Sequence, residues 1–226
     1  MIEYVTKYLN LSYYLVFNKL FWGDKMKKTN NVYFIVGHHG IGKTYLLDEL
    51  KKKFEILHID TGPLIRKIYQ EQTNGKITIA EWVKIKEAEY NNDFTNMVLC
   101  QYMEDDITNT NSIPIFITGN RSMDGIRYIA NYFGFDGRIK IIYLDAPFTL
   151  LKTNYIGREK INITDEEFRK ILDKEIQSGI NNVKEYVLNN LDACWYCYKK
   201  DNNSKIYMSL EEELLNYNSS ERGFKI

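Results

Sequence analysis

The chain has 226 residues, of which 44% are hydrophobic and 27% are charged. These fractions are typical of a globular protein, and they exclude a largely disordered chain, a collagen-like repeat and a polytopic membrane protein. The 30 Lys and Arg residues balance the 30 Asp and Glu residues, so the net charge gives no strong indication of a nucleic-acid partner.

Residues 1–30 form a predicted N-terminal extension that is dense in aromatic and aliphatic side chains. Three interpretations stay open. The extension is a helix packed on the domain, or residues 1–25 form a partner helix, which makes a homodimer possible, or Met26 is the true start. The apolar run at 11–20 is too short for a membrane span and lacks a cleavage site, so we expect a cytoplasmic protein without a transmembrane segment.

From residue 31 onward, short apolar runs alternate with helical patterns, and we treat residues 31–226 as one domain. The predicted strands are 32–36, 54–59, 113–118, 139–144 and either 193–198 or 205–208. The predicted helices are 43–53, 61–70, 78–90, 93–106, 149–157, one beginning at 164, and 181–190. This alternation predicts an α/β fold with a doubly wound parallel sheet of about five strands and helices on both faces.

The three cysteines are too few for a disulfide framework, which indicates a reducing compartment. Cys194 and Cys197 form a lone CxxC pair. A zinc site needs two further ligands at suitable spacing, and the sequence has no second CxxC or HxxxH. We therefore interpret these thiols as small apolar side chains of a strand.

A glycine-rich segment follows the first predicted strand and precedes the first predicted helix. It matches the phosphate-loop pattern G-x-x-x-x-G-K-[ST] and consists of Gly37, His38, His39, Gly40, Ile41, Gly42, Lys43 and Thr44. Backbone N–H groups of such a loop surround the β-phosphate, and the following helix adds its dipole. Lys43 is expected to reach the β- and γ-phosphates, and the Thr44 hydroxyl to bind Mg²⁺. The segment predicts binding of ATP with Mg²⁺, with no catalytic role for the two histidines.

Charged residues also follow the next two predicted strands. Asp60 and Arg66 come after strand 54–59, and Arg121 comes after strand 113–118. Because parallel strands end at one edge of a sheet, we expect these residues to lie near the phosphate loop. A guanidinium binds a phosphate with two hydrogen bonds. Asp60 is the candidate that orients Mg²⁺ or takes a proton from the acceptor.

Together these segments resemble the nucleoside monophosphate kinases, the adenylate kinase and deoxynucleoside monophosphate kinase group, over about residues 31–190. The segment Asp60-Thr-Gly-Pro-Leu-Ile-Arg66 is similar to a family segment whose arginine holds the acceptor phosphate. The segment Gly119-Asn-Arg121 is similar to a second one, although it is one residue shorter. The resemblance implies that Arg66 and Arg121 bind the acceptor phosphate.

The resemblance also implies a short lid at about 157–164, from which Arg158 closes over the transferring phosphoryl. The family usually has a further lid arginine one helical turn earlier, where this chain has Asn154. We predict that Lys43, Asp60, Arg121 and Arg158 are the catalytic residues.

Helices at about 61–108 are expected to cover the acceptor, again by resemblance. Trp82 and Glu89 are candidates for contact with its base, since their spacing puts them on one face of a helix. The alternative for Trp82 is a core position, because an aromatic residue at helical spacing usually packs inside.

The sequence therefore predicts a phosphotransferase that moves the γ-phosphoryl of Mg·ATP to a nucleoside monophosphate or a related small acceptor. Two alternatives stay open: a kinase of a nucleic-acid end or modified base, and a non-catalytic ATP-dependent switch or interaction protein. The only compact basic run near the loop is Lys51-Lys52-Lys53, which is more typical of a solvated helix end.

Overall fold

The part of the chain that a computed structural model describes comprises residues 31–90, 93–110, 113–135, 137–198 and 204–222. The predicted extension at 1–30, and with it the partner role of residues 1–25, lies outside these residues.

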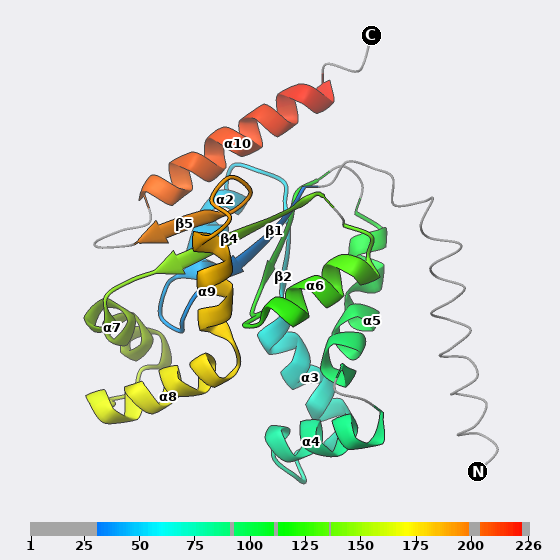
Figure 1. Cartoon of the computed structure of the whole chain (residues 1–226), viewed down its shortest axis with the longest axis vertical. Helices are drawn as coiled ribbons and strands as arrows, with labels where there is room; N and C mark the ends of the chain where they lie inside the picture. Colours follow the sequence, from blue (N-terminus) through cyan, green and yellow to red (C-terminus); the bar gives the residue numbers. More distant parts are fainter. Residues whose placement is uncertain (1–30, 91–92, 111–112, 136, 199–203, 223–226) are drawn as a thin grey trace, which may run out of the picture.

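Five parallel strands form one sheet in the order β2-β3-β1-β4-β5 (Figure 1). The strands are β1 (Val32–Val36), β2 (Leu57–Asp60), β3 (Ile115–Thr118), β4 (Ile139–Asp145) and β5 (Trp195–Tyr198). Every neighbouring pair is parallel, as predicted. The fifth strand is the earlier of the two alternatives, because residues 205–208 belong to a helix.

The helices alternate with the strands along the chain. They are α2 (Lys43–Lys51), α3 (Thr61–Thr73), α4 (Ile79–Glu89), α5 (Phe94–Thr108), α6 (Met123–Tyr132), α7 (Phe148–Glu159), α8 (Asp165–Gln177), α9 (Ile180–Leu188) and α10 (Ser204–Arg222). Thr78 and Thr164 begin α4 and α8 with capping boxes, in which each threonine hydroxyl accepts from the backbone N–H three residues later.

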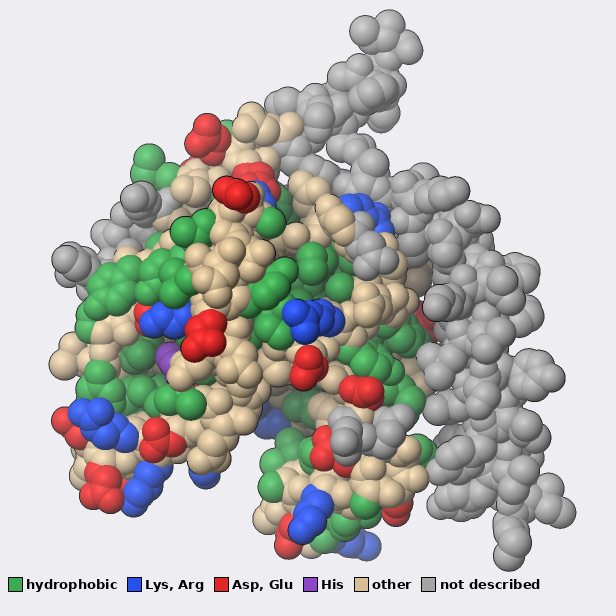
Figure 2. All heavy atoms as spheres, viewed as in Figure 1, with side chains coloured by type: hydrophobic (Ala, Val, Ile, Leu, Met, Phe, Trp, Pro, Cys, Tyr) green, Lys and Arg blue, Asp and Glu red, His purple; other side chains and the backbone are tan. Residues whose placement is uncertain are grey.

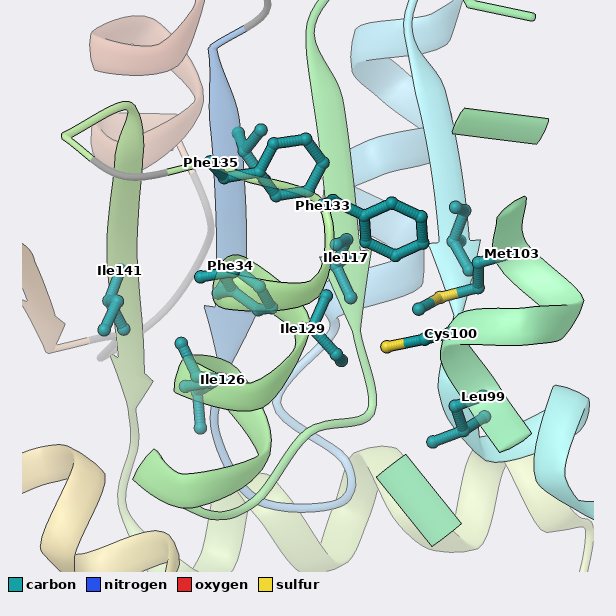
Figure 3. Close-up of a cluster of buried hydrophobic side chains, with 14 of the residues drawn as sticks. Phe34, Leu99, Cys100, Met103, Ile117, Ile126, Ile129, Phe133, Phe135 and Ile141 are labelled. Atoms are coloured by element: carbon teal, nitrogen blue, oxygen red, sulfur yellow. The ribbon is translucent and has the colours of Figure 1, made fainter. Parts of the chain in front are cut away.

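Alternate residues of each strand face opposite sides of the sheet. In β1, Val32, Phe34 and Val36 belong to one buried cluster, whereas Tyr33 and Ile35 belong to a second. The first cluster includes side chains of α3, α4, α5, α6 and α9, and Figure 3 shows part of it. The second includes side chains of α2, α7, α8 and α10. Helices thus cover both faces, which explains why the strands are continuous apolar runs.

Three strands begin later than predicted: β2 by three residues, and β3 and β5 by two residues each. Strand β2 begins at Leu57 rather than at residue 54, because α2 ends in a turn in which the N–H of Phe54 donates to the carbonyl of Leu50. The Phe54 ring packs into the second cluster, so its hydrophobicity serves the end of a helix rather than a strand.

The strand order opens a crevice at the carboxyl edge of the sheet. Strand β1 lies between β3 and β4, so the chain proceeds to β2 and β3 on one side and to β4 and β5 on the other. Ligands of doubly wound sheets bind where the strand order reverses in this way. Figure 2 shows a hollow between the lobe of α7 and α8 and the lobe of α3 and α4.

None of the helices in the described part of the chain is long and apolar enough to cross a membrane.

Candidate functional site

The predicted phosphate loop joins β1 to α2 and packs tightly against two neighbouring segments. A Cβ atom on Gly37 would lie 2.4 Å from the carbonyl oxygen of Leu144, at the end of β4. A Cβ atom on Gly40 would lie 2.2 Å from the carbonyl oxygen of Leu151 in α7. Gly40 also has a left-handed φ of 80°. Only glycine fits this approach, so packing against α7, as well as ligand chemistry, explains the glycines.

Lys43 is the first residue of α2, and its ammonium group is turned back onto the loop. Its Nζ donates to the carbonyl of Gly37 at 2.5 Å and to that of His38 at 3.2 Å. Burial lowers the pKa of Lys43 to about 8, and the charges of Arg121 and Arg158 act in the same direction. A desolvated ammonium beside two guanidinium groups favours a bound polyanion.

The loop forms one wall of a cavity of about 1100 Å³ at the carboxyl edge of the sheet. The cavity residues from the loop and α2 are Gly37, His39, Gly40, Ile41, Gly42, Lys43, Thr44 and Tyr45. Those from the acceptor-side strand ends and α3 are Asp60, Gly62, Pro63, Arg66, Gly119, Asn120 and Arg121. Those from α7 and α8 are Thr153, Asn154, Tyr155, Gly157, Arg158, Glu159 and Glu175. The fold therefore brings the predicted donor and acceptor residues to one cavity.

Two oxygen-bearing side chains of the cavity fit the magnesium site that the loop implies. The hydroxyl of Thr44 is exposed at the start of α2, and Asp60 closes β2 in the same cavity. Asp60 Oδ1 accepts from the N–H of Gly62 at 3.1 Å and so caps α3, which leaves Oδ2 for another contact. Magnesium beside nucleotides needs only one or two protein oxygens, since phosphates and water supply the others.

No cluster of three or more His, Cys, Asp or Glu side chains suited to a metal ion occurs among the described residues. Cys194, which directly precedes β5, and Cys197, which lies within it, are free thiols, and the late strand is present as predicted.

The two acceptor-side arginines line the cavity but differ in their contacts. Arg66 is exposed on α3, on the side of Gly62. Arg121 follows β3, and its Nε lies 3.3 Å from Glu175 Oε1 while its Nη2 lies 3.3 Å from His39 Nε2. Arg121 therefore contacts the phosphate loop. The prediction that Arg66 and Arg121 together bind the acceptor phosphate did not include this contact.

The α7 side of the cavity carries Arg158 and Asn154. Arg158 pairs with its neighbour Glu159 at 2.7 Å and lies over the ring of Tyr155, 5.5 Å from its centroid. Asn154 occupies the place of the family's further lid arginine, and its Nδ2 donates to the carbonyl of Gly40 at 2.8 Å. Asn154 thus ties α7 to the phosphate loop.

Trp82 and Glu89, the candidates for contact with an acceptor base, do not line the cavity. The Trp82 side chain is only 2% exposed, packs edge-on against Phe94 and donates from its indole nitrogen to Gln72 at 3.2 Å. Glu89 is exposed at the end of α4 and pairs with Lys86 at 2.7 Å. The large apolar ring joins α4 to the core, and the carboxylate belongs to the helix surface.

Glu175 on α8 also lines the cavity, although the sequence analysis did not single it out. Its side chain is 2% exposed and lies against both loop histidines. Burial by itself raises the pKa of Glu175, but hydrogen bonds from His38 and His39 and the charge of Arg121 hold it well below its ordinary value. The signal in the sequence was an acidic residue seven positions after the buried Phe168, on the apolar face of a predicted helix.

Solved structures of two kinases resemble this chain. A gluconokinase from Sinorhizobium meliloti 1021 matches with a TM-score of 0.52 and 8% identity, over 88% of this chain and 100% of its own. A shikimate kinase from Acinetobacter baumannii in complex with shikimate matches with a TM-score of 0.44 and 18% identity, over 84% of this chain and 95% of its own. No protein-family model and no curated protein matches this sequence. The likeness to the gluconokinase shows the fold alone, a doubly wound parallel sheet with helices on both faces, as predicted.

Proposed function

We propose that this protein is a kinase that transfers the γ-phosphoryl of Mg·ATP to a small anionic acceptor. The observation that carries this proposal is the shared cavity. The ammonium of Lys43 and the guanidinium groups of Arg66, Arg121 and Arg158 all line it. Such a set of cations suits a polyphosphate donor and a second anion, and the fold is one that kinases use.

On the donor side, the backbone N–H groups of the loop bind the phosphates, and Lys43 exchanges its contacts with the Gly37 and His38 carbonyls for phosphate oxygens. Bound Mg²⁺, held by Thr44 and oriented by Asp60, would neutralise charge on the β- and γ-phosphates. Arg158, in the last turn of α7, is suited to the transferring phosphoryl once it leaves Glu159. These residues orient the γ-phosphoryl and stabilise its charge.

On the acceptor side, Arg66 binds an anionic group of the acceptor and aims a hydroxyl or phosphate oxygen at the γ-phosphorus. The new bond to that oxygen forms as the bond to the bridging oxygen of ATP breaks, which releases ADP. The proton of the acceptor passes to water, because Oδ2 of Asp60 is the oxygen left for Mg²⁺. Most of the catalytic effect then comes from positioning and charge.

Nucleoside monophosphates are the first acceptors to test, because the segment ending at Arg66 resembles their kinases. Gluconate and shikimate are the second, because the structurally similar proteins act on or bind them. The basic run at the end of α2 gives little support to the nucleic-acid alternative. Lys52 pairs with Glu49 at 2.5 Å and Lys53 with Glu211 at 2.7 Å, so two of its three charges are already compensated.

The experiment is a transfer assay with γ-labelled ATP and a panel of these acceptors. We expect label in one class of acceptor and an equal amount of ADP. The Lys43→Ala variant, purified in the same way, serves as the control for contaminating kinases. ATP binding without transfer to any acceptor, or with hydrolysis alone, would favour the switch alternative.

A further inference from the structure

A buried carboxylate on α8 connects the phosphate loop to Arg121. Glu175 Oε2 lies 2.9 Å from His38 Nδ1 and accepts from the backbone N–H of His39 at 3.1 Å. Glu175 Oε1 lies 2.6 Å from His39 Nδ1 and 3.3 Å from Arg121 Nε. Each carboxylate oxygen therefore has two partners, and they come from two segments that are more than 80 residues apart.

The ring of His39 lies between the carboxylate and the guanidinium. Its Nδ1 lies 2.6 Å from Glu175 Oε1, a close contact whose geometry does not make a hydrogen bond. Its Nε2 lies 3.3 Å from Arg121 Nη2, which can only donate, so Nε2 is the acceptor of this contact. Glu175, His39 and Arg121 thus form a closed triangle of contacts.

A carboxylate at this place has an evident cost. Its charge repels the phosphates that the loop is built to bind, and a buried ion loses its hydration. The four contacts compensate the burial but not the repulsion. Arg121, however, keeps Nη1 outside the triangle, and it lines the cavity beside Lys43. The arrangement therefore makes sense if Glu175 serves to aim this guanidinium.

We propose that Glu175 is a positioning residue that holds Arg121 against the phosphate loop, so that Arg121 meets the γ-phosphoryl of ATP rather than the acceptor. This inference rests on the proposed kinase function and refines it. It assigns different roles to the two arginines that the sequence analysis grouped together. Arg121 serves the transferring group, and Arg66 serves the acceptor.

The test compares the affinities of the full chain for Mg·ATP and for Mg·ADP by calorimetry, so it needs no identified acceptor. In Glu175→Gln and in Arg121→Lys, we expect the preference for ATP over ADP to fall by about tenfold, with ADP affinity changed less than about threefold. The matched control is Glu166→Gln, since Glu166 is an 80% exposed residue of the same helix. An equal loss for both nucleotides, or an unchanged preference, would overturn the proposal.

A double variant separates positioning from a merely structural role. If Glu175 acts through Arg121, combining Glu175→Gln with Arg121→Lys lowers the ATP preference no further than the larger single effect. If the double variant instead loses ATP preference by the product of the two single fold-changes, the proposal is contradicted. If Glu175→Gln does not fold, Glu175→Asp retains the charge but shortens the side chain, and it must lower the preference in the same direction. A folded Glu175→Asp variant with the wild-type preference would equally count against the proposal.

The outcomes also separate this inference from the proposed function. A wild-type chain that binds neither nucleotide would contradict the kinase proposal itself. A chain that binds both, with a preference that none of the variants alters, would contradict only the role of Glu175.

Discussion

The donor side and the acceptor side of the cavity differ in how firmly their side chains are held. On the donor side, Lys43, His39 and Asn154 all contact other parts of the protein. On the acceptor side, Arg66 is exposed, and within the described ranges it makes no ion pair or hydrogen bond with another side chain. The two arginines show the contrast best, since Arg121 is held by Glu175 and Arg66 is not.

This difference shows that side chains on the donor side are held in place before a ligand binds, whereas Arg66 on the acceptor side is not. A polyphosphate has the same shape in every reaction cycle, so groups fixed in advance bind it without a further loss of side-chain freedom. Arg66 must order its long side chain when an acceptor arrives, which costs entropy and makes affinity depend on the acceptor's own contacts. We therefore expect large, acceptor-independent effects from the donor side and selective effects from the acceptor side.

The largest effect is expected from Lys43→Ala. Loss of the ammonium that we propose binds the β- and γ-phosphates should lower kcat for phosphoryl transfer by about a hundred- to a thousandfold. Since burial lowers the pKa of Lys43 to about 8, its charge is held at a cost, and the melting temperature should not fall appreciably. Steady-state kinetics and thermal unfolding measure both quantities. Near wild-type turnover in a folded variant would refute the assignment of the loop.

Gly40→Ala tests the packing of the donor loop on α7. The new methyl group would meet the carbonyl of Leu151, and the left-handed φ would be strained, so we expect a loss of about 3 kcal/mol in the free energy of unfolding. Gly134→Ala is the matched control. Its φ is also left-handed, at 63°, but nothing lies near the added methyl, so about 1 kcal/mol is expected. Equal losses in urea unfolding would show that the close approach contributes nothing.

Arg66→Lys tests the acceptor side. The charge is kept but the planar fork is lost, so kcat/KM for the acceptor should fall about ten- to a hundredfold while the Kd for ATP stays constant. Lys67→Arg, at the exposed neighbouring position, serves as the control. A selective loss of ATP affinity in Arg66→Lys would move this arginine to the donor side and remove the contrast.

The buried Glu175 predicts a dependence of stability on acid. Its folded-state pKa is lowered, so its stabilising contribution is present above the ordinary pKa of a glutamate and is lost as the pH falls toward the folded-state value. Wild type should therefore exceed Glu175→Gln in stability by roughly 1.5 kcal/mol at pH 6, and the gap should narrow by pH 3. Urea unfolding of wild type and Glu175→Gln at several pH values measures this difference in the free energy of unfolding. The charged or titratable groups that face Glu175 are His38, His39 and Arg121. A stability difference that increases as the pH falls would contradict an ionised Glu175 paired with these groups.

The smallest effect is expected from Asn154→Ala. This change removes one hydrogen bond to the carbonyl of Gly40, which is worth about 1 kcal/mol. ATP affinity should fall severalfold through a less ordered loop, with the KM for the acceptor unchanged. Fluorescence titration with ATP gives the first value, and steady-state kinetics gives the second. If the acceptor KM alone changed, α7 would belong to the acceptor side.

Much of the fold followed from local patterns. The alternation of short apolar runs with helical segments was sufficient to predict a parallel sheet covered on both faces, because strands buried on both sides must be apolar throughout. The predicted helix beginning at 164 matches α8, since a capping box depends only on residues three apart. The late start of β2 was missed because an apolar residue such as Phe54 can end a helix as readily as it begins a strand.

The sequence by itself was sufficient to predict a phosphate loop, because its eight residues are contiguous and their expected chemistry depends on their own backbone. It also indicated that Asp60, Arg66 and Arg121 would share an edge, because parallel strands end together. Only the tertiary structure decided that Trp82 is buried, that Glu89 lies outside the cavity, and that Arg121 turns toward the loop. These outcomes depend on contacts between residues far apart in the sequence. His38 and Glu175, for example, are 137 residues apart. No local pattern specifies which side chains folding brings together over such a separation.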